Sequence, residues 1–178
     1  MEYIVFTSNS AYDFYKQGVS FLEAAYRCLS SDNCLVTDVP IMMHSPIAVN
    51  AAFACEMFLK ALGRNENKQL RGHKLVELYN ALSDDTKKKL YLLAYTHEPQ
   101  TENEYKENVE QILTKYSSYF EDNRYTAEKV AKHNVNITGI LSLAYNLCSV
   151  TQEVVKRNET NGKTRRRLYD LIRKYTED

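Results

Sequence analysis

The chain has 178 residues, of which 44% are hydrophobic and 26% charged, which suits one soluble globular domain and leaves too little chain for two. Five glycines and three prolines are few, and this disfavours turn-rich sandwiches, barrels and disordered linkers. The 23 basic side chains balance the 23 acidic ones, so no overall field attracts nucleic acid or membrane. Residues 156–178 nevertheless hold eight basic and four acidic side chains, a local net charge of +4. Attraction for an anionic partner is therefore predicted to be local.

The N-terminus and the cysteines predict a cytoplasmic protein. Residues 1–6 lack the basic start and apolar core of a signal peptide, and no apolar run approaches the roughly 18 residues of a membrane span. The four cysteines form no CxxC pair, and Cys55 and Cys148 lie inside apolar helical patterns, where cysteine behaves as a small hydrophobe. We therefore expect a reduced protein without membrane contact, metal site or cofactor.

The first predicted helix covers residues 11–29, where apolar side chains recur at helical spacing and charged ones occupy the other face. Residues 8–10 offer an N-cap. Residues 3–6 form either a short strand or an apolar lead-in that packs on this helix, and residues 30–45 form a connection.

The second predicted helix is apolar nearly all round. Ser45 is a good N-cap, and Pro46 occupies the first helical position, where its missing N–H costs nothing. The apolar pattern runs from Ile47 to Leu62, and Gly63 is expected to end the helix. Such a helix belongs in the middle of a bundle.

Five further helices are predicted in chain order. Gly72 and His73 open a short helix that reaches Leu82, and residues 83–85 cap a helix that ends near Tyr95. The next helix begins with a Thr101–Glu104 capping box and has an apolar stripe to Phe120. The last two helices run from Ile137 to Val155 and from Thr164 to Tyr175. The predicted fold is therefore an all-α bundle over residues 1–162, with a basic amphipathic helix at residues 163–178 packed on it or extending from it.

Three segments carry a resemblance to a known family. They are the Ala- and Leu-rich stretch 51–62, the Gly72-His73-Lys74-Leu75 segment, and a loop with the pattern Arg124-Tyr125-x-x-Glu128. In this order and spacing they resemble one branch of the HEPN (higher eukaryote and prokaryote nucleotide-binding) superfamily, over about residues 46–157. The resemblance implies a HEPN-like bundle of four or five helices that commonly dimerises.

The resemblance also implies a function. Many HEPN proteins are metal-independent ribonucleases in phage defence or toxin–antitoxin pairs, and others bind nucleotides or RNA. We therefore expect an RNA- or nucleotide-binding homodimer, with metal-independent endoribonuclease activity as an open question, and a cognate antitoxin or nucleotidyltransferase-like protein as partner. The alternative is a non-catalytic dimeric module that recruits a partner protein.

Arg124 and His133 are the candidate catalytic pair. Metal-free RNA cleavage needs a base for the ribose 2′-hydroxyl and a cation for the phosphorane, and these residues supply both. The nuclease members of the family leave four to six residues between their Arg and His, whereas Arg124 and His133 are nine positions apart, as are Arg64 and His73. The alternative is that Arg124 ties its loop to a core carboxylate and His133 is merely exposed.

A polar cluster is predicted at one end of the bundle. We expect it to contain Glu56, Lys60, Arg124, Tyr125 and Glu128, with His73 nearby, because charges in an apolar helix are paired or line a cleft. The alternative is a plain intrahelical pair between Glu56 and Lys60, four residues apart. His73 either caps the short helix or contacts a phosphate there. Tyr125 is the candidate for stacking on a base.

The basic tail is the candidate RNA-backbone site. Its cations are Lys163, Arg165, Arg166, Arg167, Arg173 and Lys174. The alternative is a solvated helix face or a dimer contact.

Overall fold

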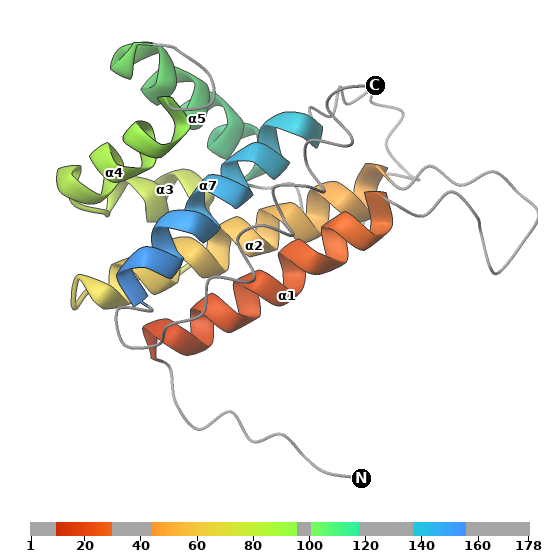
Figure 1. Cartoon of the computed structure of the whole chain (residues 1–178), viewed down its shortest axis with the longest axis horizontal. Helices are drawn as coiled ribbons and strands as arrows, with labels where there is room; N and C mark the ends of the chain where they lie inside the picture. Colours follow the sequence, from red (N-terminus) through yellow and green to blue (C-terminus); the bar gives the residue numbers. More distant parts are fainter. Residues whose placement is uncertain (1–9, 30–43, 96–100, 118–136, 156–178) are drawn as a thin grey trace, which may run out of the picture.

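The computed structural model describes residues 10–29, 44–95, 101–117 and 137–155, and these residues form six helices without a strand (Figure 1). This confirms the all-α prediction for the part of the chain that the structure describes. Four predicted segments lie outside the described residues: the short strand or apolar lead-in at residues 3–6, the connection before residue 44, the loop with Arg124 and the basic helix from residue 163.

Helix α1, Ala11–Leu29, has the predicted bounds. Ser10 caps it through a reciprocal pair of hydrogen bonds: the Asp13 N–H donates to Ser10 Oγ at 3.2 Å, and the Ser10 N–H donates to Asp13 Oδ2 at 3.3 Å. Its inner face buries Tyr15, Gly18 and Leu22. The Ser10 cap therefore determines where α1 begins, and the apolar stripe determines which of its faces is buried.

Helix α2, His44–Asn65, is longer at both ends than predicted. It already includes His44, so Ser45 is not its N-cap. Gly63 does not end it either: the chain turns at Asn67, whose φ of 58° is left-handed, and the Lys68 N–H donates to the Gly63 carbonyl oxygen at 2.8 Å. This is a Schellman termination, in which Asn replaces the more usual Gly.

The remaining helices are α3 (Leu75–Asn80), α4 (Asp84–Tyr95), α5 (Glu102–Tyr116) and α7 (Ile137–Val155). The predicted capping box of α5 is confirmed, because the Glu104 N–H donates to Thr101 Oγ1 at 3.3 Å and the Thr101 N–H donates to Glu104 Oε2 at 2.7 Å. Ser83 caps α4 by accepting the Thr86 N–H at 3.3 Å.

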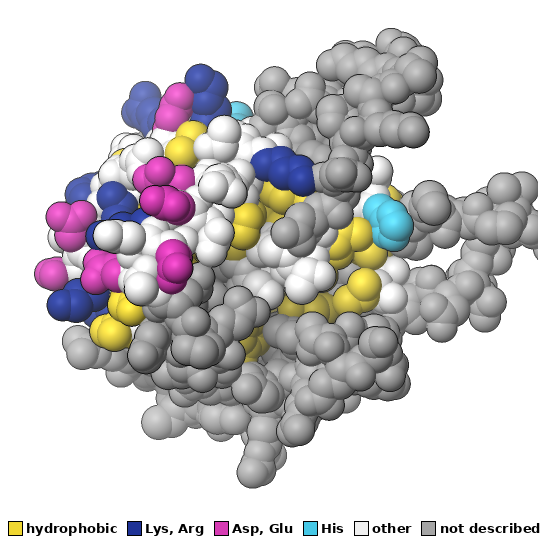
Figure 2. Space-filling view, turned by 90° about the horizontal axis from the view of Figure 1, so that it is seen from above, with side chains coloured by type: hydrophobic (Ala, Val, Ile, Leu, Met, Phe, Trp, Pro, Cys, Tyr) yellow, Lys and Arg dark blue, Asp and Glu magenta, His cyan; other side chains and the backbone are white. Residues whose placement is uncertain are grey.

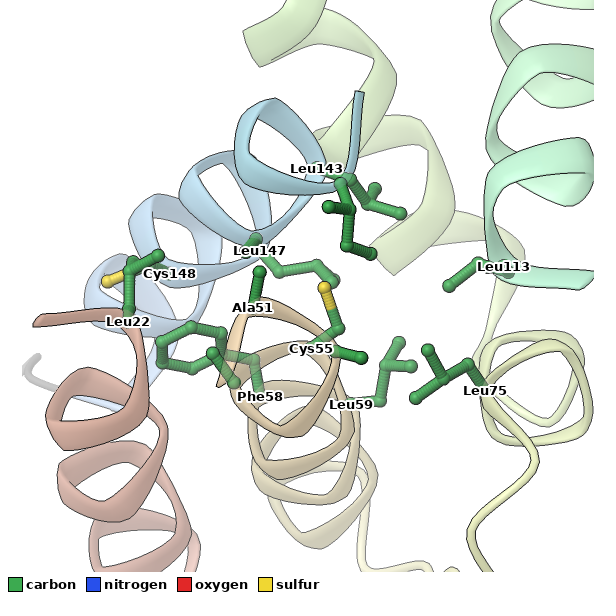
Figure 3. Packing of buried hydrophobic residues seen from close by; sticks show 14 of the residues in the cluster. Leu22, Ala51, Cys55, Phe58, Leu59, Leu75, Leu113, Leu143, Leu147 and Cys148 are labelled. Atoms are coloured by element: carbon green, nitrogen blue, oxygen red, sulfur yellow. The ribbon is translucent and has the colours of Figure 1, made fainter. Parts of the chain in front are cut away.

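Helix α2 lies at the centre of the bundle. Helices α1 and α7 pack along it, and α3, α4 and α5 form a second group at one side (Figure 1). Figure 3 shows Leu59 of α2 pointing toward Leu75 of α3, with Leu147 of α7 beside Ala51 and Cys55. Because α1, α3 and α7 cover α2 within one chain, the burial of α2 does not by itself require a second copy.

By length and composition alone, α2 is long and apolar enough to cross a membrane, which differs from the prediction that the chain has no such run. The difference arises because the apolar residues of α2 include many alanines and are interrupted by Glu56 and Lys60. The apolar stretch is 72% buried inside the bundle, as is usual for the core helix of a soluble protein.

Gly18 sets the distance between α1 and α2, and we predict that Gly18→Ala destabilises the protein. A Cβ at this position would lie 2.6 Å from Phe58 Cε1, and Phe58 is fully buried, so its ring has no room to move. Overpacking of this kind costs about 1–3 kcal/mol, which exceeds the gain in helix propensity. Urea unfolding measures the change. Ser20→Ala, an exposed change on the same helix, should leave the stability nearly unaltered, and equal stability of all three proteins would show that the contact is loose.

Candidate functional site

A buried ion pair lies in the middle of the apolar helix α2. The Glu56 side chain is only 6% exposed, and Lys60, one turn further along, is 13% exposed. Lys60 Nζ lies 2.7 Å from Glu56 Oε1. A buried carboxylate is costly unless cations or donors satisfy it, so its presence in this helix indicates a specific task.

The connection between α2 and α3 returns along α2 and brings His73 to this pair. After the turn at Asn67, Leu70 packs so closely on Gly63 that a Cβ there would lie 2.6 Å from Leu70 Cδ1. His73 Nδ1 then lies 3.0 Å from Glu56 Oε1, a contact across 17 positions of sequence. Gly63 is therefore needed for close packing of the connection and not for ending the helix.

His73 presents two different nitrogens. The Glu56 carboxylate accepts a hydrogen bond from the His73 Nδ1–H, which places the ring proton on Nδ1. The His73 side chain is 81% exposed, which leaves Nε2 for solvent. The capping alternative for His73 is wrong: the N-cap of α3 is Lys74, whose side chain makes no capping hydrogen bond, and the Val76 N–H in the first turn donates to Ser117 Oγ at 3.2 Å. The arrangement is that of an imidazole oriented by a carboxylate, the pairing found in acid–base and nucleophilic sites.

Two arginines, Arg64 and Arg71, lie close to this site in the sequence. Residues 56, 60 and 64 are successive turns on one face of α2, which places Arg64 next along from the ion pair, and Arg71 lies on the stretch between Leu70 and His73. Within the described part of the chain, neither arginine has an ion-pair partner, whereas Lys68 lies 2.8 Å from Glu66 and Lys74 lies 3.0 Å from Glu77. We call Arg64, Arg71 and His73 the basic face.

Three of the six residues predicted for the polar cluster come together: Glu56, Lys60 and His73. The others, Arg124, Tyr125 and Glu128, lie outside the described residues, as do His133 and the basic tail. Arg64 was not among the residues predicted for the cluster, although its spacing of four from Lys60 indicates that it follows on the same helix face. Among the described residues, no group of three or more His, Cys, Asp or Glu side chains is placed to hold a metal ion.

A second polar cluster joins the end of α2 to the start of α4. The Glu66 carboxylate accepts hydrogen bonds from Thr86 Oγ1 at 2.6 Å, Ser83 Oγ at 2.7 Å and the Ser83 N–H at 3.1 Å, and Lys68 Nζ lies 2.8 Å away. Burial alone would raise the pKa of this carboxyl, but the ammonium and the three donors outweigh it and lower the pKa to about 2. The cluster anchors both ends of the segment that carries Arg71 and His73.

The buried cysteine of α2 is not a reactive group. Cys55 is fully buried, and this burial raises the pKa of its thiol. Its burial and that of Cys148 confirm their prediction as core residues. Tyr79, Tyr105 and Tyr116 are likewise buried, as their places on the apolar stripes of the short helix and of the helix with the capping box indicate.

Charged side chains of both signs gather over the end of the molecule that α3, α4 and α5 form, whereas hydrophobic side chains show nearer its middle (Figure 2). The described residues therefore form an all-α fold with an exposed histidine held by a buried carboxylate. Comparison with protein-family models, with curated proteins and with solved structures finds no match to the chain.

Proposed function

We propose that the chain is a HEPN-like, RNA- or nucleotide-binding protein and that phosphate groups bind at the basic face. The observation that carries this proposal is the exposed His73 imidazole fixed by the buried Glu56 carboxylate at 3.0 Å. Burying a carboxylate in the core helix costs stability, which favours a functional reason for its presence. In this proposal, the reason is that Glu56 orients the His73 imidazole, which binds phosphate at the surface.

The unpaired guanidinium groups support the same ligand. Arginine forms bidentate hydrogen bonds with phosphate oxygens, and Arg64 and Arg71 have no carboxylate partner among the described residues. Lys60 neutralises Glu56, so the buried carboxylate does not repel an approaching phosphate. The basic tail, including Arg165 and Lys174, adds further backbone contacts in this proposal.

We predict that R64A/R71A weakens RNA binding about tenfold or more. Because each single-strand phosphate contact contributes about 0.7 to the log–log salt slope, loss of two contacts should make the slope shallower by about 1.4. Fluorescence anisotropy with mixed single-stranded RNAs at several salt concentrations measures both quantities. K88A/K89A is the matched control, because it removes the same charge from exposed positions of α4 and should change neither quantity to this extent.

The same RNAs incubated in EDTA test for cleavage, which this proposal assigns to Arg124 and His133. Metal-independent cleavage should leave 2′,3′-cyclic phosphate or 3′-phosphate ends, should fail on DNA and should be lost in Arg124→Ala and His133→Ala. Equal cleavage by all three proteins would identify a contaminant. No binding and no cleavage would favour the alternative, a dimeric module that recruits a partner protein.

A further inference from the structure

The two ring nitrogens of His73 differ in their surroundings. Nδ1 lies 3.0 Å from Glu56 Oε1, and the carboxylate fixes its proton there. In the neutral ring the lone pair is then on Nε2, and the side chain that carries it is 81% exposed. An imidazole whose outer nitrogen is deprotonated and oriented by a carboxylate is a nucleophile held ready for reaction.

His44 offers a comparison within the same chain. It is the first residue of α2 and is also exposed, but it has no hydrogen bond or ion pair with any described residue. Among the described residues, no carboxylate therefore orients its ring as Glu56 orients that of His73. Any difference in reactivity between His44 and His73 reports the effect of Glu56 and the surrounding charges.

The basic residues that precede His73 and the neutralised Glu56 carboxylate favour a phosphorus electrophile. Arg71 precedes it by two residues, and Lys60 at 2.7 Å compensates the charge of Glu56. A phosphoryl group attached to Nε2 would bring negative charge close to a stretch of chain that carries Arg71, which has no ion-pair partner among the described residues. The high exposure of the ring suits an acceptor that must enter the reactive site of its donor, since no part of the oriented imidazole needs to be uncovered first.

We propose that His73 is a phosphoryl-acceptor site whose nucleophilic atom is Nε2. The Nε2 lone pair attacks the phosphorus of a phosphoryl donor, such as a phosphoramidate or a phosphorylated side chain of a partner protein, and an Nε2–P bond forms. The bond from phosphorus to the leaving group breaks, and the leaving group keeps that electron pair and takes a proton from solvent. The Nδ1–H stays donated to Glu56 throughout, and this positioning role of Glu56 does not depend on RNA binding.

The experiment is labelling of the full chain with potassium phosphoramidate. Peptide mapping under alkaline conditions resolves the four histidines, and ³¹P NMR distinguishes the Nε2-phosphorylated ring from the Nδ1-phosphorylated one. We expect His73 to be labelled about 10-fold faster than His44 and on Nε2. Glu56→Gln should slow labelling of His73 toward the rate of His44 while leaving His44 unchanged, and His73→Ala should remove the fast site.

Equal rates at His44 and His73 in the wild-type chain would overturn the proposal, and this comparison needs no variant that has to fold. Labelling of His73 on Nδ1 would overturn it as well, because Glu56 would then not hold that nitrogen. An unchanged His73 rate in a Glu56→Gln protein with wild-type circular dichroism would remove the positioning role of the carboxylate.

Discussion

Glu56→Ala should lower the free energy of unfolding by about 3 kcal/mol. The change leaves the ammonium of Lys60 in a side chain that is only 13% exposed and without its partner, and an uncompensated buried charge is among the most costly single defects. It also removes the hydrogen bond that holds His73 at the end of the α2–α3 connection. Urea unfolding followed by circular dichroism at 222 nm (a wavelength that reports helix content) measures the loss.

Two further variants separate a buried pair from a simple helix-surface pair. E56L/K60M replaces both charges by apolar side chains of similar size and should recover most of the stability, because no unpaired charge remains. Glu23→Ala breaks the exposed Glu23–Arg27 pair of α1, also at a spacing of four, and should cost at most about 0.5 kcal/mol. If Glu56→Ala behaves like Glu23→Ala, Glu56 is solvated and the site is not buried.

The helices could be predicted because their signals are local. Apolar spacing, the Ser10 and Ser83 caps and the Thr101–Glu104 capping box all act within one or two turns. The end of α2 could not be predicted in this way, because both Gly63 and Asn67 are residues that can end a helix. The apolar pattern stops at Leu62 and favours Gly63, yet the polar turn that follows keeps its helical hydrogen bonds until Asn67 adopts a left-handed φ.

The contacts of the site likewise include one that is local in sequence and others that depend on the path of the chain. The Glu56–Lys60 pair follows from a spacing of four and was predictable as a contact. The approach of His73 to Glu56 depends on the path of the connection, which the turn at Asn67 and the packing of Leu70 on Gly63 determine together. Contacts such as that of Glu66 with Thr86, 20 positions away, have no local pattern, so sequence alone gave no sign of the second cluster.

That second cluster should make the fold sensitive to acid. The pKa of Glu66 is about 2 in the folded protein and about 4.5 in the unfolded chain, so the folded state binds its proton less readily. The resulting stability is fully present above pH 4.5 and is lost as the pH falls toward 2. It amounts to about 2 kcal/mol at neutral pH after allowance for solvent screening of a carboxylate at the edge of the fold.

Glu66→Gln therefore should destabilise the protein at pH 7 by about 2 kcal/mol, and the difference from wild type should shrink as the pH is lowered from 5 to 3. Urea unfolding at a series of pH values measures this difference directly, and taking the difference cancels the other carboxylates. Glu77→Gln is the matched control, since Glu77 pairs with Lys74 at 3.0 Å but is 67% exposed, and its effect should stay below about 0.5 kcal/mol at every pH. A Glu66 difference that does not change with pH would mean that the protonated carboxyl keeps the contacts of the carboxylate, so that the pKa of Glu66 is the same in the folded and unfolded chains and its charge does not contribute to the α2–α4 junction.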